Sequence, residues 1–171
     1  KITPDAAESI IGKLPAEVGK IGVFVDEDPQ TVKRIVEQCG LNMIQLHGRE
    51  NPELYKESGV PIIKAFGIGG EEDVAAVNGC RESYVLADSP KGVFQGGNGH
   101  SFDWSSSKPN RLKGKKVILA GGLHAGNVAE AIMQVQPFMV DVSSGVETDG
   151  RKDVEKIKRF IEAAKGGNNG C

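Results

Sequence analysis

The chain alternates between short, largely apolar runs and longer segments whose apolar residues recur at helical spacing. Six apolar runs are predicted as strands, and they cover residues 21–25, 43–48, 61–66, 84–88, 116–120 and 138–142. The first of them, from Ile21 to Val25, is continuously apolar, which is typical of a parallel strand buried on both faces. We therefore expect a sheet of parallel strands.

Helical signals lie before the first strand and after most of the others. Capping residues followed by apolar residues three and four positions apart predict helices at about 4–14, 29–38, 51–59, 71–77, 125–135 and 153–165. The chain opens on a helix, because Thr3 suits its N-cap and Pro4 its first position. The strand at 84–88 instead precedes a long loop, from Ser89 to Asp103.

This alternation predicts an α/β fold with parallel strands joined by right-handed crossovers. Two architectures satisfy it, an open doubly wound sheet and a closed (β/α)8 TIM barrel. Polar or small residues at the ends of many strands favour the barrel, because an open sheet concentrates its site at one switch point. A barrel has eight strands and six are found, so we expect one incomplete barrel domain over residues 1–165 and a flexible polar tail at 166–171.

Composition and charge narrow the class of protein. The 171 residues are 39% hydrophobic and 26% charged, which is ordinary for a soluble globular domain. The net charge of −2 is spread along the chain and predicts no nucleic-acid partner. No apolar run approaches the roughly 20 residues of a membrane span, and nothing resembles a secretory signal. Cys39, Cys80 and Cys171 show no metal-binding spacing, so we expect reduced thiols in the cytosol and no metal.

Small residues follow the last two predicted strands. Gly121 and Gly122 follow the fifth strand, and Ser144 and Gly145 follow the sixth. Glycines let the backbone N–H groups approach a ligand, and a nearby helix N-terminus favours an anion. In a (β/α)8 barrel the loops after the last two strands commonly bind phosphate, so we expect a phosphate group there. The alternative is that these glycines merely permit tight turns.

Three polar residues at strand ends are further candidates. Asp88 ends an apolar strand, where a carboxylate above apolar side chains suits a general acid. His47 could be a base, a ligand or an ordinary hydrogen-bonded residue. Asp141 could contact a substrate or pair with a neighbouring loop.

Four motifs occur in a characteristic order. They are Gln45-Leu46-His47-Gly48, then Gly96-Gly97-Asn98-Gly99 to Phe102-Asp103-Trp104, then Leu119-Ala120-Gly121-Gly122-Leu123 with Asn127-Val128, and finally Asp141 to Glu147 with Lys152-Asp153. Together they closely resemble the phosphoribosylanthranilate isomerase family of tryptophan biosynthesis. Each motif alone is weak, but their common order, over a match from Ile2 to about Ile161, is specific.

The resemblance implies a (β/α)8 barrel that converts N-(5′-phosphoribosyl)anthranilate to an open-chain 1-deoxyribulose phosphate. This Amadori rearrangement needs no cofactor. The family's general acid toward the ribose ring oxygen is an aspartate whose motif falls on Asp88. Its phosphate-binding glycines and serines match Gly121, Gly122, Ser144 and Gly145, and we expect Gln45, His47 and Asp141 to contact the substrate.

Two parts of the family's machinery find no match in this chain. The family's general base is a cysteine in a Lys-Ile-Cys-Gly segment at the end of the first strand, and that segment does not occur here. An arginine from a Ser-x-Arg-Lys-Ile-Thr-Pro type of segment also holds the substrate, whereas this chain begins at Lys1-Ile2-Thr3-Pro4. The resemblance thus implies an N-terminally truncated isomerase, without the first strand, first helix and second strand of the barrel.

Such a chain is expected to have little or no activity alone. Its strands at 21–25 and 138–142 would be apolar edges. Three outcomes are open: the sequence is a fragment of a longer gene, which we expect, another chain or fragment closes the edges and completes the barrel, or the chain remains a collapsed sheet. The alternative function is a non-catalytic, phosphate-binding remnant. A related enzyme, indole-glycerol-phosphate synthase, would need a catalytic lysine, for which Lys64 is the only candidate.

Overall fold

A computed structural model describes residues 1–88 and 111–166. The chain divides into two compact units, one formed by residues 1–65 and 82–84 and the other by residues 66–81 and 85–171. The predicted glycine loop with Asn98 and Trp104 and the tail beyond Gly166 lie outside the described residues.

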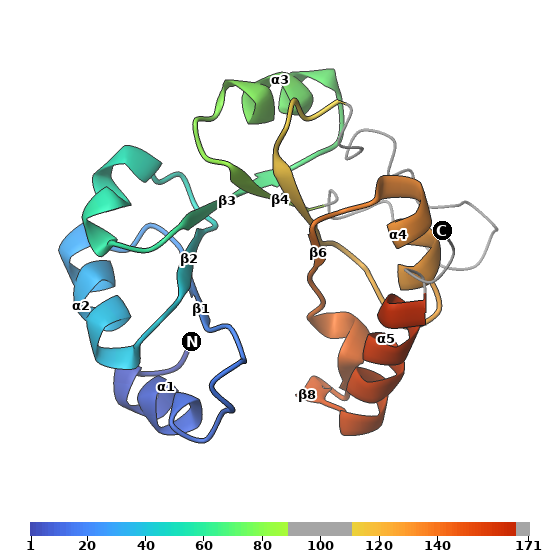
Figure 1. Ribbon diagram of the computed structural model, residues 1–171, viewed down its shortest axis with the longest axis horizontal. Helices are drawn as coiled ribbons and strands as arrows, with labels where there is room; N and C mark the ends of the chain where they lie inside the picture. Colours follow the sequence, from blue (N-terminus) through green and yellow to red (C-terminus); the bar gives the residue numbers. More distant parts are fainter. Residues whose placement is uncertain (89–110, 167–171) are drawn as a thin grey trace. The chain divides into compact units, whose positions relative to one another are not determined.

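The first unit consists of alternating helices and parallel strands. Its elements are α1 (Pro4–Ile11), β1 (Ile21–Phe24), α2 (Pro29–Cys39), β2 (Met43–Leu46), the 3₁₀ helix η1 (Pro52–Ser58) and most of β3 (Ile62–Gly67). β1 pairs with β2, and β2 with β3, both in parallel. Helices α1 and α2 pack side by side (Figure 1).

Local signals explain where the helices of this unit begin and end. The side chains of Thr3 and Asp28 accept hydrogen bonds from the first turns of α1 and α2, each of which has a proline at its start. Gly40 ends α2 in the left-handed conformation (φ 60°). Val32, Val36, Ile44 and Leu46 then form the buried core between α2 and the strands.

The second unit carries the remaining elements, except for Tyr84, the first residue of β4. They are α3 (Glu71–Gly79), β4 (Tyr84–Asp88), β5 (Lys116–Leu119), α4 (Val128–Val135), β6 (Met139–Val140), the 3₁₀ helix η3 (Ser144–Val146), a hairpin of β7 (Glu147–Thr148) and β8 (Arg151–Lys152), and α5 (Val154–Gly166). Helices α4 and α5 pack against each other (Figure 1). Their core includes Leu119, Leu123, Val135 and Phe160, all at most 5% exposed.

The strand order confirms the predicted fold class. The six strands follow one another in the sheet in the order β1-β2-β3-β4-β5-β6, which is also their order along the chain. A doubly wound sheet reverses its strand order at a switch point, whereas a (β/α) barrel does not. The chain therefore has the topology of a (β/α) barrel, with six parallel strands among the described residues.

Element boundaries differ from the predicted ones in a few places. The first helix ends at Ile11, because Gly12 caps it. β6 is shorter than predicted, although the Asp141 N–H still donates to the Leu119 carbonyl (2.8 Å). The β7–β8 hairpin was not predicted, since its strands are short and charged. Its turn, Asp149-Gly150, has φ angles of 50° and 72° and carries the Asp-Gly signal that could have revealed it.

Candidate functional site

Gln45 and His47 lie at the carboxyl end of β2, in the first unit. The Gln45 side chain is buried, and its Nε2 lies 3.0 Å from Nδ1 of His47. The His47 ring is exposed, while its backbone N–H donates to the Phe24 carbonyl (2.9 Å). The two predicted substrate-binding residues of this unit are therefore neighbours, one buried and one open to solvent.

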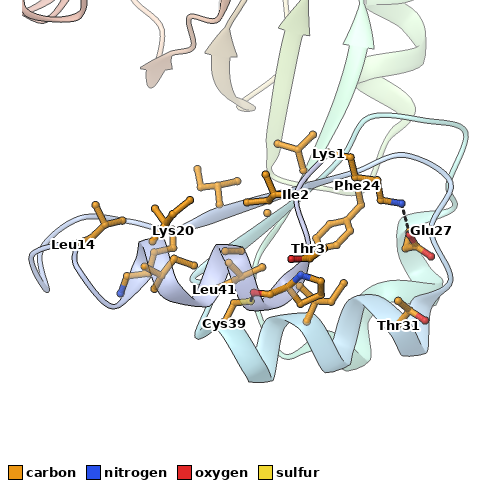
Figure 2. A pocket seen from close by; sticks show the side chains of 18 of the residues that line it. Lys1, Ile2, Thr3, Leu14, Lys20, Phe24, Glu27, Thr31, Cys39 and Leu41 are labelled. Carbon is orange, nitrogen blue, oxygen red and sulfur yellow. Dashed lines mark hydrogen bonds and ion pairs between the residues drawn. The ribbon is translucent and has the colours of Figure 1, made fainter. Parts of the chain in front are cut away.

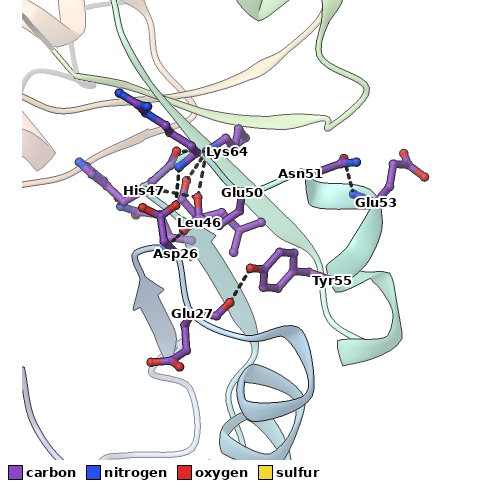
Figure 3. Close-up of polar contacts among 12 residues, drawn as sticks. Asp26, Glu27, Leu46, His47, Glu50, Asn51, Glu53, Tyr55 and Lys64 are labelled. Atoms are coloured by element: carbon purple, nitrogen blue, oxygen red, sulfur yellow. Dashed lines mark hydrogen bonds and ion pairs between the residues drawn. The ribbon is translucent and has the colours of Figure 1, made fainter.

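Beside them is a buried ion pair that sequence reasoning did not identify. Lys64 Nζ in β3 lies 3.2 Å from Glu50 Oε2, and the two side chains are only 10% and 1% exposed (Figure 3). Lys64 also donates to the carbonyls of Gly48 (2.6 Å) and Leu46 (3.3 Å). All three acceptors of Lys64 Nζ therefore come from residues 46–50.

Asp88 ends β4 and belongs to the second unit, as do the two glycine-containing loops. Its carbonyl accepts a hydrogen bond from the Ile68 N–H (2.8 Å), and its side chain is half-buried. The preceding residue, Ala87, accepts from the N–H of Ala120 (2.9 Å), directly before Gly121. Asp88, the candidate acid, thus ends the strand next to β5, which leads into the loop of Gly121 and Gly122.

The loop after β5 is held in a tight turn. Gly121 and Gly122 have φ angles of 84° and 58°, which favour glycine. The Asn127 side chain closes this turn, because it accepts from the His124 N–H (2.8 Å) and donates to the Gly122 carbonyl (3.2 Å). Hydrogen bonds within the loop therefore fix its conformation.

The loop after β6 packs directly on it. A Cβ atom at Gly145 would overlap the carbonyl of Leu123, so only glycine allows this close approach. Ser144 and Asp141 are exposed in the same loop. The structure therefore brings Gly121, Gly122, Ser144 and Gly145 into two adjacent loops.

Lys152 contacts the loop after β6. Its Nζ donates to the Ser143 carbonyl (3.0 Å) and hydroxyl (3.3 Å) and to the carboxylate of Glu147 (2.7 Å). Lys152 lies in one of the motifs that resemble the family, but the sequence predicts no role for it. The reason is that the β7–β8 hairpin, which brings Lys152 to Ser143, was not predicted. Because this ammonium is already paired with the carboxylate of Glu147, its shown role is to hold the loop after β6.

The described cysteines do not fit a general base. Cys39 is the last residue of α2, and its thiol donates to the Pro4 carbonyl (3.5 Å). Burial, followed by the nearby carboxylates of Glu8 and Asp5, raises the pKa of the Cys39 thiol above its usual value. Cys80 caps the end of α3. Neither stands at the carboxyl end of a strand.

Within residues 1–88 and 111–166, no cluster of three or more histidine, cysteine, aspartate or glutamate side chains could hold a metal ion. None of the described helices is long and apolar enough to cross a membrane.

Comparisons with known proteins identify the family. The model of the N-(5′-phosphoribosyl)anthranilate isomerase family matches residues 1–163. The isomerase of Bacillus cereus is 52% identical over 167 residues, which are 96% of this chain and 82% of that protein. The Bacillus mycoides isomerase is 49% identical, and 81% of its length is covered.

Solved structures agree with this match. The Thermotoga maritima isomerase superposes with a TM-score of 0.84 at 41% identity, over 96% of this chain and 82% of that one. An isomerase crystallised with reduced 1-(o-carboxyphenylamino)-1-deoxyribulose 5-phosphate gives a TM-score of 0.83 at 39% identity, over 96% of this chain and 80% of that one. The chain therefore belongs to the phosphoribosylanthranilate isomerase family.

Proposed function

We propose that this chain carries the general acid and the phosphate-binding loops of a phosphoribosylanthranilate isomerase of tryptophan biosynthesis. The reaction converts N-(5′-phosphoribosyl)anthranilate to 1-(2-carboxyphenylamino)-1-deoxyribulose 5-phosphate. Substrate and product are isomers, so the reaction consumes no oxidant or reductant. One observation carries the proposal. Asp88 and the two small-residue loops lie at the carboxyl ends of three consecutive strands, β4, β5 and β6, and all of them belong to the second unit.

Asp88 is assigned as the general acid. It donates a proton to the ribose ring oxygen as the bond from this oxygen to C1′ breaks, and a base then removes the proton from C2′. The second step needs a group that this chain does not provide, since the family's Lys-Ile-Cys-Gly segment is absent from its sequence.

The substrate's phosphate is assigned to the backbone of Gly121, Gly122, Ser144 and Gly145. Positive φ angles at the two first glycines and the close packing of Gly145 support this assignment, because both leave peptide N–H groups uncovered by side chains. Gln45, His47 and Asp141 are assigned to the other parts of the substrate.

We also propose that a further strand-helix-strand segment completes the barrel. β1 is at the end of the strand order, and Val23 in this strand and Val25 directly after it are 60% and 63% accessible. Between β1 and α1 lies an apolar groove of about 770 Å³, with Ile2, Leu14, Phe24 and Leu41 on its walls (Figure 2). A barrel has eight strands, and the match covers 82% and 81% of the length of the Bacillus cereus and Bacillus mycoides isomerases.

Residues 1–165 are proposed to form a single, incomplete barrel domain. The protein is proposed to work in the cytosol, where the thiols of Cys39 and Cys80 stay reduced.

The test joins this chain to the part of the Bacillus cereus isomerase that the match leaves uncovered. Turnover is followed by the loss of fluorescence of freshly made phosphoribosylanthranilate. We expect the chain alone to be about 10²- to 10⁴-fold slower than the joined protein, because a general base is missing. Equal rates would contradict the need for completion.

The alternative is a phosphate-binding remnant without catalysis, for which the close packing of the two small-residue loops would be sufficient by itself. The same joined protein distinguishes the two. If it folds and binds inorganic phosphate but shows no turnover, the isomerase proposal fails and the remnant is supported. Asp88→Asn in an active joined protein is the control that links turnover to the acid.

A further inference from the structure

We infer that Lys64 and Glu50 are positioning residues, which hold the loop after β2 so that the exposed His47 ring points in one direction. The inference deepens the proposed function, on which it rests, because it concerns how the proposed substrate contact of His47 is held. It starts from the buried pair of Lys64 and Glu50, whose side chains are 10% and 1% exposed (Figure 3).

The pair clamps the residue that directly follows His47. The Gly48 N–H donates to Glu50 Oε2 (2.8 Å), and the Gly48 carbonyl accepts from Lys64 Nζ (2.6 Å). On the other side, the N–H of His47 donates to the Phe24 carbonyl of β1 (2.9 Å). The backbone of His47 is therefore held on both sides, while its ring remains exposed.

Glu50 also joins this loop to the loop after β1. Its Oε1 accepts from the Asp26 N–H (2.7 Å), and Asp26 Oδ1 accepts from the Arg49 N–H (2.7 Å). Asp26 has a φ of 50°, which is uncommon for a residue other than glycine, and a Cβ at Gly48 would collide with its carboxylate. The two loops are thus locked to each other through one buried carboxylate.

Stability alone does not account for such a pair. Taking both charges out of water costs several kcal/mol per ion in general, and apolar residues of similar volume commonly stabilise a protein as well or better. The hydrogen bonds of this pair, however, end on the backbone on either side of His47. Because these hydrogen bonds end on the backbone of Leu46 and Gly48, they indicate that the pair fixes the backbone conformation of this loop.

Amide hydrogen exchange followed by NMR tests the inference on the full chain. In the unaltered protein, we expect the amides of Asp26, Gly48 and Arg49 to be protected. In Lys64→Met and Glu50→Gln, exchange of the Gly48 amide should accelerate about ten- to a hundredfold, because a hydrogen bond to a charged group is weakened or lost. The His47 ring nitrogens should change chemical shift and broaden in the same variants.

The matched control is Lys56→Met, which breaks the exposed pair of Lys56 and Glu53 (2.6 Å) in the same unit. It should leave the Gly48 amide and the His47 ring unchanged. If the amides of Asp26, Gly48 and Arg49 are not protected in the unaltered chain, the inference is overturned. This measurement does not depend on whether either variant folds. A lower melting temperature with unchanged Gly48 exchange and an unchanged His47 ring would also overturn it, because the pair would then only stabilise the core.

These measurements need no turnover, so they separate the inference from the proposed function. In a joined protein that is active, Lys64→Met should raise KM more than it lowers kcat, since it disturbs a binding contact and leaves Asp88 in place. An unchanged KM in that protein would contradict the proposed contact between His47 and the substrate. It would leave the hydrogen bonds from Lys64 and Glu50 to the loop backbone supported by hydrogen exchange.

Discussion

At the scale of single residues, Gly145 shows how one missing side chain brings two loops together. Replacing Gly145 with alanine would push a methyl group into the Leu123 carbonyl, so we expect the chain to lose about 1–3 kcal/mol of stability. The midpoint of urea unfolding measures this loss. Gly79→Ala in α3 is the control, because nothing lies within 4 Å of the added methyl group, and it should keep or slightly raise the midpoint. Equal midpoints for Gly145→Ala and the unaltered chain would show that the loops separate easily.

At the scale of elements, α5 depends on a carboxylate at its start. Asp153 accepts from the hydroxyl of Thr148 (2.7 Å) and from the amides of Glu155 (2.9 Å) and Lys156 (3.2 Å). The hydrogen bond from Thr148 comes first among the causes that lower the pKa of Asp153 below its ordinary value of 3.8. Because the folded pKa is the lower one, the stability that the ionised group contributes is complete above pH 3.8 and is lost as the pH falls through the folded pKa.

Asp153→Ala should therefore unfold more easily than the unaltered chain at neutral pH, and the difference should shrink below pH 3.8. Chemical unfolding at a series of pH values measures it. Glu162→Ala removes an exposed carboxylate from the same helix and serves as the control. A difference that stays constant down to strongly acid pH would mean that the charge of Asp153 does not contribute.

At the scale of the whole molecule, β1 lies at the end of the strand order and exposes Val23. An apolar strand edge without a pairing strand among the described residues is a template for association with other chains. Val23→Lys should therefore reduce concentration-dependent association, as measured by static light scattering. Met133→Lys, at a helix position that is 63% exposed, is the control and should change association much less. Similar effects of both substitutions would point to general solubility instead of the edge.

Sequence patterns predicted most of the elements, because the signals that begin and end them are local. Thr3-Pro4 and Asp28-Pro29 lie directly at the helices they start, and Gly40 at the helix it ends. The charged β7–β8 hairpin lacks an apolar pattern, so the position of Lys152 beside Ser143 was not predicted. Lys64 lies in the middle of a predicted strand, and nothing in the local sequence indicates that the Glu50 carboxylate lies beside it.

The sequence by itself determined the order of strands and helices and the family, and it singled out Asp88 and the small residues after β5 and β6 as candidate site residues. These depend on residue types at short spacing and on motifs in a fixed order. Only the tertiary structure decided that Glu50 joins the loops after β1 and β2, and that Gly145 packs on Leu123. The physical reason is strand register, which sets Leu46 opposite Lys64 and thereby puts a buried ammonium beneath the loop that carries His47.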